Sequence, residues 1–102
     1  MKYNEISENK NQNSIKIKAS GDVLCQEIDN ELVILNLKDE RYLGLDESGT
    51  IFWRALMETD SLEDAFNRLQ DEFDVKPSVL LKDMNDLITE LKDNGLIEIS
   101  EV

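Results

Sequence analysis

The sequence predicts an α+β fold in which a small antiparallel sheet comes first and three helices follow. Runs rich in Val, Ile and Leu, separated by turn residues, fill residues 23–45, as is typical of short strands. From residue 51 to residue 91, apolar residues recur at helical spacing instead. A chain of 102 residues that is 40% hydrophobic can bury one modest core, which indicates a single domain.

Three short strands are expected. Residues 23–28 and 32–37 (LVILNL) read as a hairpin, because the Asp29-Asn30 pair between them tolerates the backbone angles of a tight turn. Residues 15–18 (IKIK) alternate and can extend the first strand, and residues 41–45 (RYLGL) form the third. Cys25 lies mid-strand among apolar neighbours and is therefore predicted to be a small buried hydrophobe.

Helix boundaries are marked by capping residues. Asp46 and Ser61 can accept hydrogen bonds from the free amides of a first turn, Pro77 suits a first helical position, and Gly95 suits the residue after a helix end. Residues 96–99 (LIEI) either form a last strand or pack beside the third helix. The predicted buried stripes are Ile51, Phe52, Ala55 and Leu56, with Trp53 on their flank as a packing anchor or a pocket wall; Leu62, Ala65, Phe66, Leu69 and Phe73; and Leu80, Met84, Leu87, Ile88 and Leu91.

The charge is distributed unevenly along the chain. Residues 1–19 carry four Lys and two Glu, a net charge of +2, whereas the rest carries seven Lys or Arg and 21 Asp or Glu, or −14. Residues 1–14 are polar and lack apolar periodicity, so residues 1–19 are predicted to be a mostly disordered tail and residues 20–102 the domain. A domain this acidic repels nucleic acid phosphates, so nucleic acid is not the expected partner.

Catalytic and metal chemistry have little support. The chain has no His and one Cys, so it lacks a Cys/His pair, the usual zinc ligands and an internal disulfide. Its clustered carboxylates do not follow the order of a calcium loop. No apolar run approaches the roughly 20 residues of a membrane span, and no signal peptide is recognisable. We therefore expect a cytoplasmic binding module that is not an enzyme and uses no cofactor or metal.

Residues 20 to about 100 resemble the PqqD family of small leader-peptide-binding domains, the RiPP recognition elements. The similar stretches are DVLCQEIDNELVILNL, RYLGLDESGTIFWRAL, SLEDAFNRLQDEFDV and DMNDLITELKDNGLIEI, in the family's order and spacing. Asp46 stands where the family more often has Asn, a difference that keeps the capping role. Phe52 lies between Ile51 and Trp53, which corresponds to the family's Ile-x-Trp form.

The resemblance implies a winged-helix-like fold whose third strand lies at an exposed sheet edge. In this family the leader of a ribosomally made precursor peptide adds as a further strand beside that third strand and lies against the third helix. One flank of this helix carries Val79, Asp83, Asp86, Leu87 and Glu90, and the other carries Leu81, Asn85, Ile88 and Lys92. Family analogy favours the first flank. The predicted leader-binding residues are Arg41, Tyr42, Leu43, Gly44, Leu45, Val79, Asp83, Asp86, Leu87 and Glu90.

The function expected from this resemblance is leader-peptide binding and delivery of the precursor to a maturation enzyme in natural product biosynthesis. A leader peptidase in a lasso-peptide pathway is the expected partner, and radical-SAM or cyclodehydratase-type enzymes are further possibilities. Two alternatives stay open on sequence grounds. The first is a winged-helix DNA-binding regulator, although the third helix is net negative. The second is a non-catalytic interaction domain of an enzyme complex.

Overall fold

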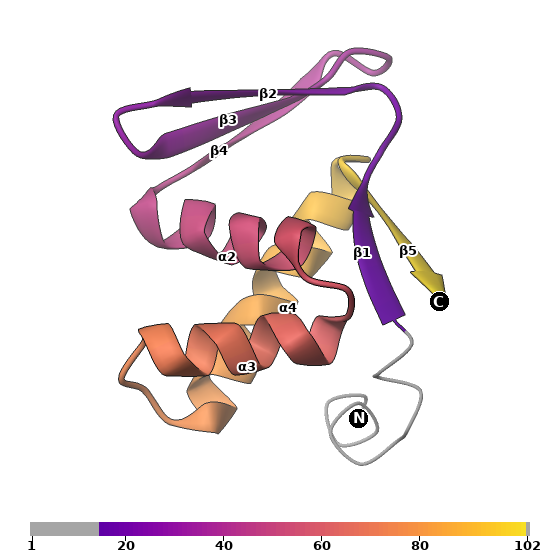
Figure 1. Ribbon diagram of the computed structural model, residues 1–102. Coiled ribbons are helices and arrows are strands. Elements are labelled where there is room, and N and C mark those ends of the chain that lie inside the picture. Colours follow the sequence, from indigo (N-terminus) through magenta and orange to yellow (C-terminus); the bar gives the residue numbers. More distant parts are fainter. Residues whose placement is uncertain (1–14, 102) are drawn as a thin grey trace.

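The computed structural model describes residues 15–101 as two small antiparallel sheets and three helices (Figure 1). The elements are β1 (Ile15–Ala19), β2 (Val23–Ile28), β3 (Glu31–Asn36), β4 (Arg41–Leu45), α2 (Glu47–Glu58), α3 (Leu62–Glu72), α4 (Pro77–Asp93) and β5 (Ile97–Glu101). The sheet of β2, β3 and β4 covers α2, and α3 packs on α2 away from the sheet. The predicted α+β class, with a three-stranded antiparallel sheet and three helices, is confirmed.

The hairpin of β2 and β3 has the tight turn that the sequence predicts. Ile28 pairs with Glu31 across a two-residue loop, and Asp29 and Asn30 have φ angles of 52° and 69°. The two-residue turn that matches the twist of the strands requires positive φ at both loop residues. Asn and Asp tolerate positive φ better than most residues. This local chemistry fixes the register of the sheet.

Strand β1 is a separate element rather than an extension of the first strand. It pairs antiparallel with β5, which confirms that the C-terminal segment forms a strand, and Ile17 is buried opposite Ile99. The Lys16 ammonium donates to the carbonyls of Leu56 and Thr59 at 2.9 and 2.5 Å, at the end of α2. Residues 15–19 were expected in the tail and instead belong to the fold. The predictions for residues 1–14 lie outside the described residues.

The predicted helix signals are found in place. Asp46 Oδ1 accepts from the Gly49 amide at 2.8 Å, and Ser61 Oγ accepts from the Asp64 amide at 3.1 Å. Pro77 occupies the first turn of α4, and Gly95 follows its end with φ of 70°.

The core follows the predicted stripes. Trp53 is 6% exposed and belongs to the buried core, so of its two predicted roles the structure supports that of a packing anchor. Ile51 and Leu87 are only partly buried at the border of the core. Most of the remaining stripe residues are buried, namely Phe52, Ala55, Leu56, Leu62, Ala65, Leu69, Leu80, Met84, Ile88 and Leu91, while Phe66 and Phe73 pack against them half-buried.

The prediction for Cys25 was wrong, because this side chain is exposed. Cys25 pairs with Ile34, which is fully buried, so both side chains point to the helical side of the sheet. Helix α2 nevertheless packs mainly against β3 and β4, so the inner side of β2 is less covered than that of β3. Partial desolvation still raises the pKa of the Cys25 thiol.

Candidate functional site

Strand β4 has a backbone edge that pairs with no other strand among residues 15–101. It lies at one end of the strand order β2-β3-β4. Backbone hydrogen bonds alternate along an antiparallel pair, and the Leu37 amide donates to the Asp22 carbonyl of the β2 side at 2.8 Å. The backbone groups of every second residue of β3 therefore point toward β4, where the strand partners are Arg41, Leu43 and Leu45. The N–H and C=O groups of Tyr42 and Gly44 point away from the sheet.

The N-terminal end of β4 is tied to the end of α4. The Arg41 guanidinium donates to the Asp93 carbonyl at 2.8 Å. The neighbouring Asn36 amide is buried and donates to the carbonyls of Asn94 and Gly95 at 3.3 and 3.1 Å. A Cβ atom on Gly95 would lie 2.7 Å from Asn36 Nδ2, so a side chain there would displace this contact. Strand and helix therefore meet at this end of the site.

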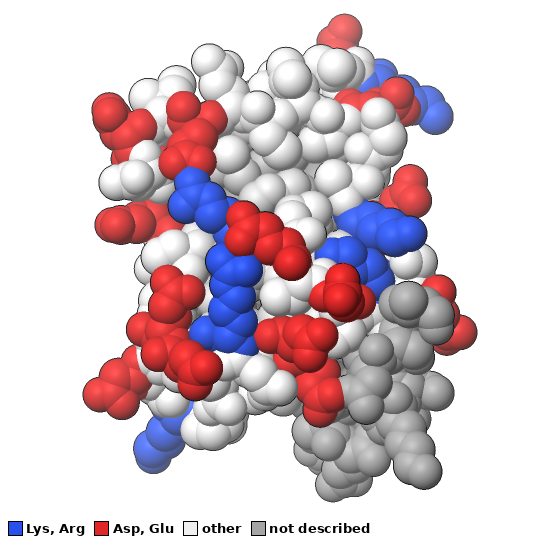
Figure 2. Space-filling view, in the orientation of Figure 1, with Lys and Arg blue, Asp and Glu red and all other residues white. Residues whose placement is uncertain are grey.

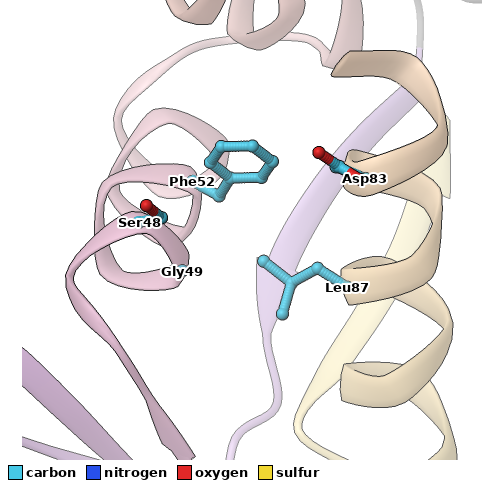
Figure 3. Close-up of a pocket in the computed structure, with 5 residues that line it drawn as sticks. All are labelled: Ser48, Gly49, Phe52, Asp83 and Leu87. Carbon is cyan, nitrogen blue, oxygen red and sulfur yellow. The ribbon is translucent and has the colours of Figure 1, made fainter. Parts of the chain in front are cut away.

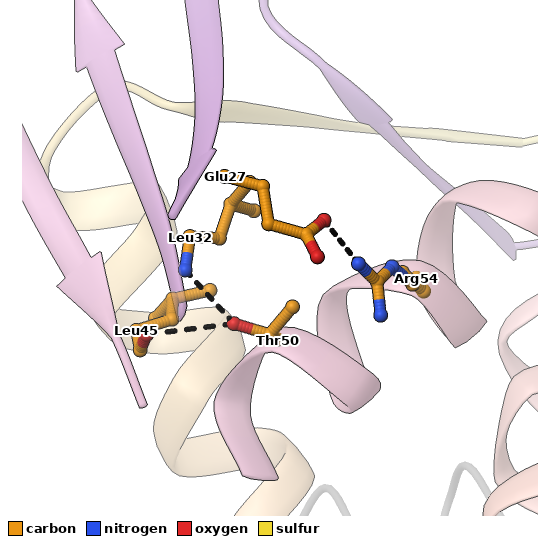
Figure 4. A network of polar contacts seen from close by, with 5 residues as sticks. All are labelled: Glu27, Leu32, Leu45, Thr50 and Arg54. Carbon is orange, nitrogen blue, oxygen red and sulfur yellow. Dashed lines mark hydrogen bonds and ion pairs between the residues drawn. The ribbon is translucent and has the colours of Figure 1, made fainter. Parts of the chain in front are cut away.

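Thr50 closes the C-terminal end of β4. Leu32 and Leu45 are strand partners, but the Leu32 amide donates to Thr50 Oγ1 at 3.1 Å, and this hydroxyl donates to the Leu45 carbonyl at 3.4 Å (Figure 4). The hydroxyl thus takes the place of a direct strand bond. Figure 4 also shows the ion pair of Glu27 with Arg54, which ties β2 to α2. The chain leaves the sheet at this point and enters α2.

A shallow hollow of about 190 Å³ lies between the start of α2 and the middle of α4. Figure 3 shows Phe52 and Leu87 pointing toward one another across it, with Asp83 at its border. Phe52 is held edge-to-face against Phe73, with ring centroids 5.4 Å apart. We call this the α2–α4 hollow, and its lining residues are Ser48, Gly49, Phe52, Asp83 and Leu87.

The hollow and the strand edge adjoin one another. Gly49 lies at the border of both, because a Cβ atom there would be 3.2 Å from Leu45 Cβ. Asp83 precedes Asp93 by ten residues, or about 15 Å of helix, and five strand residues span about 13 Å. The N-terminal end of β4 thus contacts the end of α4, and its last residue, Leu45, lies beside Gly49 of the hollow.

The structure brings together part of the predicted site. All five predicted strand residues belong to β4, where Leu45 is buried and Tyr42 is 70% exposed. On α4, Asp83 and Leu87 of the favoured flank line the hollow. The other predicted flank residues do not line it: Val79, Asp86 and Glu90 are exposed, and Asp86 binds Lys82 at 2.8 Å.

Sequence reasoning missed the contribution of α2 to the hollow. Ser48, Gly49 and Phe52 form that side. The available signal was Gly49, since a glycine in a first helical turn often indicates a close neighbour. Phe52 was assigned to the core, and this residue is indeed only 8% exposed, although it also lines the hollow.

Asp83 is the one charged residue among the described residues that line the hollow. Among residues 15–101, no three Cys, Asp or Glu side chains lie close enough together to hold a metal ion. Within the same range, no helix is long and apolar enough to cross a membrane. Asp83 is exposed at the border of an apolar hollow, so it can attract a cation without being desolvated.

Fold and site together define a small α+β domain that presents a free strand edge beside an apolar hollow. The family model described as coenzyme PQQ synthesis protein D (PqqD) matches residues 31–97, which are 67 of the 102 residues. The chain belongs to the PqqD family, as the sequence resemblance predicts.

Two solved structures are similar to this chain. The first is TbiB1 in complex with the TbiA(beta) leader peptide, with 31% sequence identity, a TM-score of 0.74, and coverage of 79% of this chain and 94% of that one. The second is lasso peptide synthetase B1 complexed with the leader peptide, with 22% identity, a TM-score of 0.72, and coverage of 81% and 98%. At this lower identity the second likeness supports the fold alone. No curated protein matches the sequence.

Proposed function

We propose that this chain binds the leader segment of a ribosomally made precursor peptide and delivers the precursor to a maturation enzyme. A leader peptidase of a lasso-peptide pathway is the enzyme we favour. The observation that carries the proposal is the free edge of β4 beside the α2–α4 hollow, in a chain 31% identical to TbiB1, which was solved with a leader peptide. Precursors of this kind leave the ribosome in the cytoplasm, where we expect this chain to act.

The backbone edge accounts for part of the binding free energy. Tyr42 and Gly44 offer four outward groups, and each hydrogen bond contributes about 0.5–1.5 kcal/mol net, or about 2–6 kcal/mol together. Micromolar binding requires about 8 kcal/mol, beyond the cost of ordering the peptide. An apolar leader side chain in the α2–α4 hollow can add about 1.5–3 kcal/mol. Leader recognition therefore needs both the edge and the hollow.

Alternation along a strand determines which leader side chains enter the site. Leader residues opposite Tyr42 and Gly44 point to the same outer side of the sheet as those residues, whereas the residues between them point toward α4. The inward residue nearest Leu45 lies beside the hollow. We propose that this residue is apolar, and that a neighbouring Lys or Arg lies near Asp83.

The alternative of a DNA-binding regulator lacks a suitable surface. Helix α4 would be the recognition helix of a winged-helix protein, and it carries Lys82 and Lys92 against four carboxylates, those of Asp83, Asp86, Glu90 and Asp93. Binding to duplex DNA requires a positive surface that neutralises phosphates. The charge of α4 therefore favours a peptide ligand.

A direct comparison of ligands tests the proposal. Labelled leader peptide, from the precursor encoded beside this chain, and labelled duplex DNA are titrated against the protein at about 150 mM salt. We expect micromolar leader binding and no duplex binding tighter than about 10 µM. Added leader should protect the amides of Tyr42 and Gly44 from hydrogen exchange more than that of Leu43, which already faces β3. Tight, salt-sensitive duplex binding without leader binding would contradict the proposal.

A further inference from the structure

The side of the sheet that faces away from the helices is apolar and has no partner among the described residues. Strand register places Leu24, Leu35 and Tyr42 in one row across the three strands, and Gln26, Val33 and Gly44 in the next. Ile28 and Glu31 complete this side at the hairpin end. We call these eight residues the outer sheet face.

The apolar side chains of the outer sheet face are unusually exposed to solvent. Leu24, Ile28 and Tyr42 are 52%, 57% and 70% exposed, and Val33 and Leu35 are half-buried beside them. Glu31 is the one charged residue of the eight, in a chain of which 33% is charged. Contiguous exposed apolar surface with few charges is typical of the centre of a protein interface.

Acidic residues border this face at both ends. Asp29 lies in the β2–β3 turn, Asp22 precedes β2, and the β3–β4 turn carries Asp39 and Glu40 against Lys38. Figure 2 shows the sheet end of the molecule largely uncharged, with carboxylates gathered at its borders. A second copy would bring the same acidic border against this one, in a chain of net charge −12. A complementary partner instead has an apolar patch bordered by Lys and Arg.

The outer sheet face is continuous with the leader-binding edge. Tyr42 and Gly44 belong to both, since their side-chain positions lie on this face and their backbone groups form the edge. A leader strand added to β4 would place its outward side chains in the same rows, next to Tyr42 and Gly44. The apolar face would then be enlarged by residues of the bound leader.

We propose that the outer sheet face docks the maturation enzyme that receives the precursor, through an apolar patch of that enzyme bordered by basic residues. This inference depends on the proposed function. Because the docking face includes side chains of the bound leader, the enzyme contacts domain and leader together. The loaded domain therefore binds the enzyme more tightly than the empty domain.

The test separates docking from leader binding. The double variant Leu24→Asp/Ile28→Asp places charge at two exposed positions, and Ile99→Asp, at a residue 47% exposed on β5, is the matched control. Leader affinity and the melting transition should change little in both variants. The readout is the concentration of domain that half-saturates precursor cleavage by the purified leader peptidase of the same gene cluster. We expect at least a tenfold increase for the double variant and none for Ile99→Asp.

Three results would overturn this inference. The first is that the double variant half-saturates precursor cleavage at the same concentration as the parent domain. The second is that the parent domain sediments as a dimer at about 100 µM while the double variant sediments as a monomer. A second copy would then occupy this face. The third is a parent chain that binds no leader, which would overturn the proposed function as well. Only the last of these affects both, so the two failures are distinguishable.

Discussion

Strands β2 and β4 are the two edges of one sheet, and they differ in what lies beneath their inner side chains. On β2, Cys25 and Glu27 point toward the helical side and remain exposed, because α2 packs mainly under β3 and β4 and meets β2 through the ion pair of Arg54 with Glu27. On β4, Leu43 is half-buried and Leu45 is buried against α2. Both strands offer unpaired backbone groups, but only β4 adjoins the α2–α4 hollow.

This difference indicates what converts a sheet edge into a peptide site. Backbone hydrogen bonds are available at either edge and are independent of peptide sequence. Anchoring and selectivity come from side-chain pockets beside the edge. We therefore expect leader binding at β4 and none at β2, and three pairs of variants test this comparison.

The largest expected effect comes from proline at each edge. Gly44→Pro removes an outward amide on β4, and Cys25→Pro removes one on β2, where alternation also places the amide outward. Leader affinity, measured by fluorescence anisotropy, should fall at least tenfold for Gly44→Pro, equivalent to about 1.4 kcal/mol. Cys25→Pro should change it less than about twofold. Both variants should keep a cooperative melt, and the opposite ranking would place the leader on β2.

A smaller effect is expected from truncation in the hollow. Leu87→Ala removes apolar contact area for the leader, while Leu81→Ala truncates a half-buried leucine on the other flank of α4. Leader affinity should fall about fivefold for Leu87→Ala, or about 1 kcal/mol, and little for Leu81→Ala. Calorimetric titration measures both, and thermal melts report any loss of stability. A larger effect from Leu81→Ala would assign the leader to the other flank.

The smallest expected effect concerns charge at the border of the hollow. Asp83→Asn should weaken binding of a leader carrying Lys or Arg by about two- to threefold, because exposed ion pairs contribute about 0.2–1 kcal/mol. The effect should disappear in about 1 M salt, where charges are screened within about 3 Å. Glu98→Gln, an exposed change on β5, is the control. Tighter binding by Asp83→Asn would mean that this carboxylate opposes the leader.

Local sequence signals predicted much of the fold. The Asp29-Asn30 turn, the Asp46 and Ser61 caps and the helical stripes each depend on neighbours within a few residues, so the sequence is sufficient to place them. The pairing of β1 with β5 joins residues more than 75 positions apart, for example Ala19 with Ile97. No local pattern specifies such a contact, and residues 15–19 were therefore assigned to the tail.

The site was predictable to a lesser extent. Cys25 and Ile34 are strand partners of similar apolar character, yet their burial depends on how far the helices extend beneath the sheet. A helical projection of α4 gives two flanks but not the one that faces α2. Tertiary packing decides both questions, and it placed Asp83 and Leu87 in the hollow while leaving Val79 and Glu90 outside it.

The contacts that bound β4 at both ends affect how fast a leader dissociates. Asn36 and Arg41 fix one end to α4, and the Thr50 hydroxyl ends the strand at the other, so the edge offers outward groups from two residues. Such a short edge fits micromolar affinity. With a typical association rate constant of about 10⁶ M⁻¹s⁻¹, a leader would leave about once per second. Enzymes commonly turn over about ten times per second, so the rate of leader dissociation and the rate of processing agree to within about an order of magnitude. A longer edge would hold the leader more tightly and slow each round of transfer.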